Sequence, residues 1–210
     1  ARVQQEAINA DPVVFDRTGL LGVPGLIHAY RAGNVGIANA PGAGVADNKA
    51  IYPCMPDIIK YFLDEDAVLP QIPTYRGWVT EEETFIRENL ANLVVKLSGG
   101  AGGYGMLVGP TATRKEIKEF EGAFNESPEN YVAQNLVEFS SHPTHIKDGF
   151  QPRRVDLRPY ALVGESIKVL PGGLTRVALK EGSYVVNSSQ GGGSKDTWVL
   201  APPLSNEGPA

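Results

Sequence analysis

The sequence predicts an α+β fold with mostly antiparallel sheets, and three observations carry that prediction. Apolar runs at residues 93–97 and 106–108 flank a glycine-rich loop, which is typical of a β-hairpin. Capping-box patterns that begin at Thr80 and Thr113 each precede an amphipathic segment and predict two helices. Several further strand-like runs follow residue 130. This order of strands and helices is that of an α+β lobe.

The amino-terminal part of the chain contains short apolar runs broken by glycine and proline. In residues 1–47 this pattern favours short strands and turns at a sheet edge over a helical hairpin. We expect a short helix start at residues 48–53, because Asn48 is a good N-cap residue. A helix follows from Pro56, with its apolar residues at helical spacing through Leu63.

The rest of the chain alternates helices and strands. One helix is expected at about residues 81–91, and the helix after Thr113 places Ile117, Phe120 and Phe124 on one face. The strands expected after these helices cover residues 131–139, 155–164, 167–179 and 183–190, and the loops cover residues 140–154 and 189–196.

Composition limits the class of protein and its partners. The chain has 210 residues, of which 42% are hydrophobic and 20% charged, so it can build one large domain or two small lobes. A net charge of −5 argues against nucleic acid as a partner. No apolar run approaches the roughly 18 residues of a membrane helix, which argues against a membrane partner. With Cys54 alone no internal disulfide can form, so we expect a cytoplasmic protein.

The start of the chain indicates a piece of a longer protein. The sequence begins at Ala1 without methionine, and its first residues resemble the middle of a strand. We therefore expect a fragment whose partner is a missing amino-terminal domain or a second copy of the chain.

The loop between the first two predicted strands raises the question of a ligand. Between Gly99 and Gly105 only Ala101 and Tyr104 carry side chains, and ordering so many glycines is entropically costly. Glycine N–H groups can converge on a phosphate, and Lys96 just before the loop can add a positive charge. The spacing fits neither the P-loop nor the dinucleotide-binding pattern. A phosphate-covering flap and an ordinary flexible hairpin tip both stay open.

The order of motifs along the chain extends this picture. The chain contains, in order, LLGVPGLIHAYRAGNVGIANAPGAGVADNKAIYP, LVVKLSGGAGGYGMLVGP, YVAQNL, VDLRPYALVG, LPGGLTRVAL and VVNSSQGGGSKDTWVL. Together they resemble the circularly permuted ATP-grasp family, whose ATP site is similar to that of glutathionylspermidine synthetase. The resemblance implies two lobes: residues 1–90 and 138–210 in the larger one, and residues 91–137 in a small ATP-binding lobe with the glycine flap.

The resemblance also implies ATP and Mg²⁺ as cofactors and assigns residues to the nucleotide. Lys49 in NKAIYP and Lys96 in VVK reach the phosphates from opposite sides, and the glycine loop covers the triphosphate. Gln134 lies at the hinge between the lobes, next to the backbone that holds adenine. The residues expected to bind ATP are Lys49, Lys96, Gly99, Gly100, Gly102, Gly103, Tyr104, Gly105, Gln134, Asn135 and Leu136.

Two arginines are the catalytic residues that the resemblance implies. Arg176 in GGLTR matches a phosphate-binding arginine, and Arg158 in DLRP lies on the active face of the second lobe. The alternative for Arg158 is a simple ion pair with Asp156, and that for Lys96 is a strand end at the surface.

The expected metal site departs from the family pattern. Relatives carry RRxDDD followed by DP at the matching start, whereas this chain reads ARVQQEAINADP. Gln4 or Ala7 therefore stands where a carboxylate is expected. Mg²⁺ prefers oxygen ligands, so Glu6, Asn39 and Asn187 are the predicted metal ligands. A weakened site, a different ligand set and an inactive protein all stay open.

The activity that the resemblance implies is ATP-dependent ligation of a carboxylate and an amine through an acylphosphate. The substrates are then a small-molecule or peptide acid and an amine. Two alternatives from other classes stay open. One is a nucleotide- or peptide-binding module without ligase activity, and the other is a scaffold lobe that only pairs with another subunit.

Overall fold

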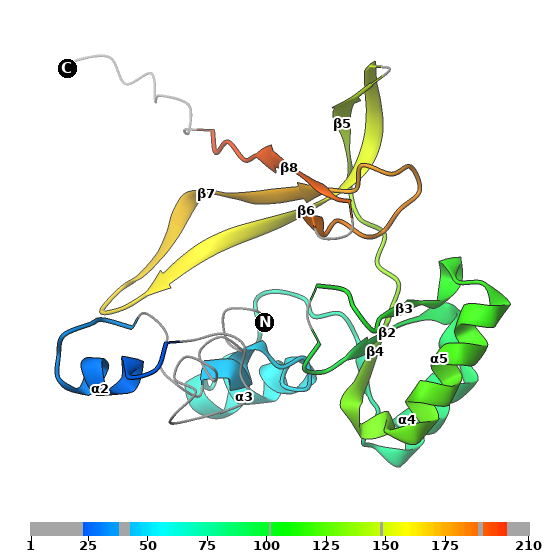
Figure 1. Ribbon diagram of the computed structural model, residues 1–210, viewed down its shortest axis with the longest axis horizontal. Coiled ribbons are helices and arrows are strands. Elements are labelled where there is room, and N and C mark those ends of the chain that lie inside the picture. The colour runs from blue at the N-terminus through cyan, green and yellow to red at the C-terminus, as the bar shows by residue number, and fades with distance from the viewer. Residues whose placement is uncertain (1–22, 38–42, 101, 148, 189–190, 201–210) are drawn as a thin grey trace. The chain divides into compact units, whose positions relative to one another are not determined.

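The computed structural model describes residues 23–37, 43–100, 102–147, 149–188 and 191–200 (Figure 1). The chain divides into two compact units, Ala1–Leu136 and Val137–Ala210. Each unit contains a four-stranded antiparallel sheet with helices confined to the first unit in the described part of the chain. The prediction of an α+β fold with mostly antiparallel sheets is confirmed.

The sheet of the first unit has the strand order β1-β4-β2-β3. Its central strands are β2 (Leu93–Leu97) and β4 (Tyr131–Asn135), with β1 (Thr74–Arg76) and β3 (Leu107–Val108) at the edges. The hairpin of β2 and β3 around the glycine loop is as predicted. Because β1 belongs to this sheet, residues before 91 contribute to it, and the assignment of segments to a large and a small lobe stays a prediction.

Two helices cover one face of this sheet and form the core of the unit (Figure 1). They are α4 (Thr80–Glu88) and α5 (Arg114–Glu126). Strand residues alternate between faces, so odd-numbered residues of β2 and β4 point toward the helices. The buried residues of this core are Ile86, Leu90, Leu93, Val95, Leu107, Phe124, Tyr131 and Ala133. The even-numbered residues of β2 and β4 point to the opposite face of the sheet.

The two capping-box predictions have different outcomes. At α5 the box is present: the N–H of Glu116 donates to Thr113 Oγ1 at 3.3 Å, and the N–H of Thr113 donates to Glu116 Oε2 at 2.7 Å. At α4 it is absent, because the helix begins at Thr80 itself without a side-chain cap. The carboxylate of Glu83 pairs with Arg87 one turn later instead.

The described amino-terminal elements are helices and turns, so the prediction of short strands is wrong for residues 23–37 and 43–47. Residues 1–22 and 38–42, to which the same prediction applied, lie outside the described residues. Helix α2 (Leu26–Arg31) is followed by short 3-10 turns at Ala43–Asp47 and Tyr52–Cys54, and by α3 (Met55–Leu63). Gly25 and Gly33 have φ of 88° and 74° and bound α2. Glycine at such positions ends a helix as readily as it turns a strand, and the sequence pattern did not distinguish the two.

The second unit is a sheet of order β5-β6-β7-β8. Its strands are β5 (Ser141–Ile146), β6 (Gly149–Val163), β7 (Ile167–Val177) and β8 (Gly193–Asp196), and β6 and β7 form a long ribbon (Figure 1). β7 and residues 155–163 of β6 match the predictions. The first residues of β6 (149–154) and all of β5 and β8 lie in segments predicted to be loops, so the loop prediction is wrong there. The strand predicted at residues 183–190 is absent from the part of it that is described, residues 183–188. Polar and glycine residues in β5 and β8 hide the strand pattern, because pairing with β6 and β7 forms these strands.

Candidate functional site

The candidate site lies on the sheet face of the first unit that α4 and α5 do not cover. Lys96, Val132 and Gln134 point to this face because they are the even-numbered residues of β2 and β4. They line a pocket of about 380 Å³, which the segment of residues 46–55 closes from the other side. Strand alternation thus places a pocket that contains both lysines back to back with the core.

Lys96 is held in this pocket by a neutral partner. Its Nζ donates to Gln134 Oε1 at 2.8 Å, and the two residues are diagonal neighbours on adjacent strands. Burial lowers the pKa of Lys96, and the positive charge of Lys49 lowers it further. A carboxylate would raise that pKa, but the group in contact is an amide.

Lys49 reaches the same pocket from the other side. Its N–H donates to the carbonyl oxygen of Ser98 at 2.9 Å, and its Nζ donates to the carbonyl oxygen of Gly100 in the glycine loop. Burial lowers the pKa of Lys49, and Asp47 partly offsets that effect. The structure thus brings together both predicted lysines and the start of the loop.

The described part of the glycine loop has a conformation that requires glycine. Gly102, Gly103 and Gly105 have φ of 67°, 78° and 64°. A Cβ on Gly105 would also lie 2.8 Å from Leu97 Cδ1. Tyr104 is 70% exposed, so its side chain is available to a ligand or solvent.

The residues assigned to adenine lie where the chain leaves the first sheet. Asn135 is the last residue of β4 and is exposed, and Leu136 is the last residue of the first unit. Their role in holding adenine stays a prediction.

The predicted arginines lie together in the second unit. Asp156 on β6 is paired in register with Arg176 on β7. Asp156 Oδ2 accepts from Arg158 Nε at 3.1 Å and from Nη2 at 2.9 Å, so the simple ion pair expected as an alternative is present. Arg176 Nη1 donates to Ser188 Oγ at 3.3 Å, while its Nε is buried without a hydrogen-bond partner among the described residues.

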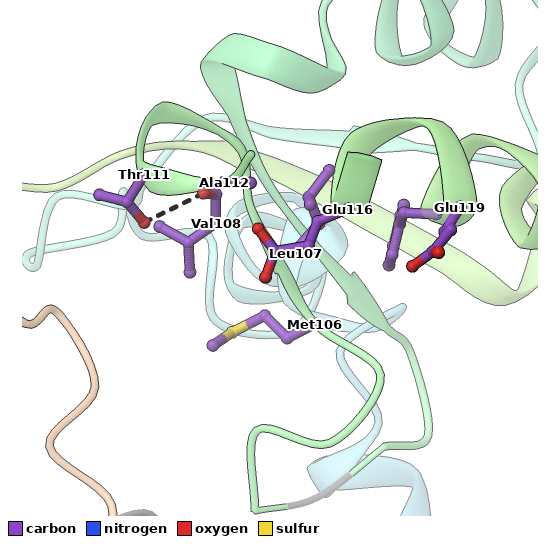
Figure 2. A pocket seen from close by; sticks show the side chains of 8 residues that line it. Met106, Leu107, Val108, Thr111, Ala112, Glu116 and Glu119 are labelled. Atoms are coloured by element: carbon purple, nitrogen blue, oxygen red, sulfur yellow. Dashed lines mark hydrogen bonds between the residues drawn. The ribbon is translucent and has the colours of Figure 1, made fainter. Parts of the chain in front are cut away.

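A second pocket of the first unit has the opposite charge. It has a volume of about 400 Å³ and lies between β3 and the start of α5 (Figure 2). Its charged residues are Glu116 and Glu119, and none of its residues is a predicted site residue. The capping-box bonds of Thr113 lower the pKa of Glu116 and keep it ionised. A polyanion therefore fits the lysine pocket and not this one.

The comparisons with known proteins give the family. A family model described as circularly permuted ATP-grasp type 2 matches residues 2–178. The chain belongs to this family. It is 54% identical over 191 residues to an uncharacterized protein of Synechocystis, which covers 90% of this chain and 40% of that protein. It is 47% identical over 196 residues to an uncharacterized protein of Mycobacterium tuberculosis, which covers 93% of this chain and 36% of that protein.

A further relative of this ATP-grasp chain has a name that mentions an activity. It is a protein of Frankia casuarinae provisionally named as a glutamate–cysteine ligase, 44% identical over 179 residues. These residues are 85% of this chain and 21% of the Frankia protein. The chain thus spans at most about two fifths of the length of these relatives. In its described residues, no helix is long and apolar enough to cross a membrane.

Of the three predicted metal ligands of this ATP-grasp chain, only Asn187 is among the described residues. Glu6 and Asn39 lie outside the described residues. Asn187 is described and half-buried, and its carbonyl oxygen accepts from the N–H of Gly192 at 2.9 Å. Over the described ranges, no group of three or more His, Cys, Asp and Glu side chains could hold a metal ion. The assignment of Glu6, Asn39 and Asn187 to a metal ion stays a prediction.

Sequence reasoning missed three residues at or beside the lysine pocket. Asp47 and Tyr52 line it, and Tyr52 Oη accepts from the N–H of Ile72 at 3.0 Å. Thr74 contacts Gln134 from the neighbouring strand. The alternation of β2 and β4 predicts which of their residues share a face, but no local pattern indicates which other segments pack there.

Proposed function

We propose that this chain binds the triphosphate of ATP between Lys49 and Lys96 and supplies the nucleotide-binding part of an ATP-dependent carboxylate–amine ligase. The observation that supports this most is the pair of half-buried ammonium groups in one pocket, both held by neutral oxygens. Family membership agrees with it. So do the ligase names of the Frankia relatives.

The charge of the pocket suits a phosphate chain. Burial away from water lowers the pKa of both lysines, and the charge of Lys49 lowers that of Lys96 further. An anion between them offsets the cost of burying these charges and adds charge-assisted hydrogen bonds. When nucleotide binds, we expect Lys49 Nζ to exchange the Gly100 carbonyl for a phosphate oxygen. The glycine loop then covers the phosphates with its N–H groups.

The reaction we propose proceeds in two steps. A carboxylate oxygen attacks the γ-phosphorus, the bond to the β–γ bridging oxygen breaks, and ADP leaves as an acylphosphate forms. A neutral amine then attacks the acyl carbon, inorganic phosphate leaves with the C–O bond electrons, and the nitrogen loses a proton to give the amide. In these steps the lysines and the loop position the phosphates, neutralise charge and exclude water from the acylphosphate. Arg176 and Arg158 are proposed to act on the transferred phosphoryl group.

Amino acids or short peptides are the proposed substrates, and the cytoplasm is the proposed location. The names of the Frankia relatives mention glutamate and cysteine. Because this chain matches only 21% of one of those proteins, an assay should pool amino acids and polyamines rather than test that pair alone.

The test is calorimetric titration of the chain with ATP, with and without Mg²⁺, followed by an assay of ADP release. We expect ATP binding that Lys96→Ala weakens about 10- to 150-fold, since a hydrogen bond to a charged group contributes about 1.5–3 kcal/mol. The control is Lys115→Ala, because Lys115 is a surface residue with an 85% exposed side chain. It should leave affinity unchanged.

The outcomes separate the alternatives. ADP release that depends on both an acid and an amine supports the ligase. Binding of ATP without such release supports a nucleotide-binding module. Equal affinity of the wild type and Lys96→Ala contradicts the proposed site.

A further inference from the structure

We propose that Thr74, which does not line the lysine pocket, is a positioning residue that fixes the side-chain amide of Gln134 and through it the ammonium group of Lys96. The inference deepens the proposed function, because Lys96 is the phosphate-binding group of that site. It is carried by a chain of three hydrogen bonds that ends on a backbone carbonyl.

The first two bonds fix the orientation of the Gln134 amide. Lys96 Nζ can only donate, so the Gln134 atom 2.8 Å from it must be the oxygen, Oε1. The amide nitrogen then points the other way, where Nε2 donates to Thr74 Oγ1 at 2.8 Å. The hydroxyl oxygen is the only hydrogen-bond acceptor on the Thr74 side chain, so it accepts this bond.

The third bond fixes the role of Thr74. Its hydroxyl donates to the carbonyl oxygen of Ile72 at 2.9 Å. The single hydroxyl hydrogen is therefore committed, and toward Gln134 the oxygen can act only as an acceptor. An acceptor at this point selects the amide nitrogen and turns Oε1 to Lys96.

Sheet geometry makes this arrangement rigid. Thr74 on β1 and Gln134 on β4 are directly opposite in the antiparallel register, and such pairs share one face at close range. Ile72, which accepts the last bond, itself lines the pocket. The chain of bonds thus begins and ends at the pocket wall and passes through a residue behind it.

The arrangement also explains why a neutral partner suits Lys96. A carboxylate at position 134 would face the Thr74 oxygen, whose hydrogen is bonded elsewhere, and two acceptors would meet. An amide satisfies both neighbours and leaves the charge of Lys96 uncompensated. That charge remains available to an anion.

The test uses the 210-residue chain and two substitutions, Thr74→Val and Thr74→Ser. Valine keeps the shape of threonine and removes the acceptor, whereas serine keeps the acceptor and removes only the methyl group. NMR titration of ¹³C-labelled lysine side chains, assigned with Lys96→Ala, reports Lys96 without any ligand. Of the charged groups around it, Lys49 faces it and Asp47 lies on the same segment as Lys49, so both are left unchanged.

We expect Thr74→Val to lower the pKa of Lys96 by about half a unit, because its ammonium loses a fixed acceptor. Thr74→Ser should restore the wild-type titration. In ATP titrations Thr74→Val should weaken binding about three- to tenfold, and Thr74→Ser should not. Thermal unfolding followed by circular dichroism confirms that each variant is folded. If Thr74→Val does not fold, Thr74→Asn, which keeps an acceptor, and Thr74→Ala, which lacks one, replace it.

An unchanged Lys96 titration in the folded variant without the acceptor overturns the inference. So does equal loss in the serine variant, which would show a purely structural role. If the Lys96 titration shifts as expected but neither the wild-type chain nor any variant binds ATP, the chain of hydrogen bonds is correct and the proposed function fails. The two failures are thus distinguishable.

Discussion

The lysines predicted to bind ATP in the first unit and Arg158 in the second unit are held in opposite ways. In the first unit, Lys96 and Lys49 donate to an amide oxygen and a backbone carbonyl. In the second unit, Arg158 donates twice to the carboxylate of Asp156, and the backbone N–H of Arg176 donates to the same group at 3.3 Å. No carboxylate contacts the ammonium group of Lys96, whereas the charge of Arg158 is paired with that of Asp156.

The difference shows what a core allows a site to do. In the first unit, residues of β2 and β4 alternate between a helix-covered core and the pocket, so packing fixes the strands that carry Lys96 and Gln134. In the second unit, the described buried apolar residues are few: Val177, Ala178 and Val186. A unit with a large core can hold repelling charges in place, because packing offsets the cost of their desolvation.

The largest expected effect comes from removing that core. Phe124 is fully buried and its ring centroid lies 5.5 Å from that of Tyr131. Phe124→Ala should lower the free energy of unfolding by about 3–5 kcal/mol and abolish nucleotide binding. In the second unit, Leu157 is 61% exposed, so Leu157→Ala should change it by less than about 0.5 kcal/mol. Urea unfolding measures both, and equal effects would remove the contrast in packing.

The second test gives Lys96 a carboxylate partner, as Arg158 has in the second unit. Gln134→Glu places a carboxylate at the position of the amide next to Lys96, which should raise the pKa of Lys96 and weaken ATP binding about 10- to 100-fold. The matched control is Asn125→Asp, which adds the same charge at an exposed residue of α5, the helix that covers the opposite face of the sheet. Calorimetry measures both affinities. Equal losses in both variants would indicate general repulsion of ATP and not neutralisation of Lys96.

The lowered pKa values predict how stability and binding depend on pH. The pKa of Lys96 is lower in the folded chain than the 10.5 of an ordinary lysine. Between those two values the unfolded chain binds more protons, so the contribution of Lys96 to stability rises with pH. ATP affinity should fall over the same window, because deprotonation removes the charge that the phosphates contact. Unfolding and calorimetry between pH 8 and about 10, each compared with Lys96→Met, isolate the contribution of Lys96; parallel curves would contradict the shift.

Among the changes to charged groups, the smallest effect is expected from Asp156→Asn in the second unit. The Arg158 side chain is 43% exposed, so solvent screens its pair with Asp156 and the loss of stability should be at most about 1 kcal/mol. ATP affinity should not fall, because the change removes a negative charge. A loss above this range would show that the carboxylate organises the second sheet, and thermal unfolding measures it.

Local patterns predicted the elements whose signals are strong over a few residues. Strand β2, its hairpin with β3, helix α3 and the capping box at Thr113 all follow from hydrophobic spacing and cap chemistry. The wrong predictions come from elements with weak local signals. The sequence pattern predicts short strands and turns where the six-residue α2 forms, and loops where β5 and β8 form. In each case, the neighbouring segments decide the conformation.

The residues by themselves determined that Lys96 ends a buried strand beside a glycine loop, and their motif order indicated the family. They did not determine what surrounds the ammonium group. The resemblance implied that Lys49, 47 residues away in the sequence, meets the same ligand as Lys96. Tertiary structure alone shows the pocket that the two lysines line and places Thr74 behind Gln134. The physical reason is that the alternation of side chains along a strand determines only which face of the sheet each residue points to. Hydrogen-bond partners and charge neighbours depend on which distant segments pack on that face.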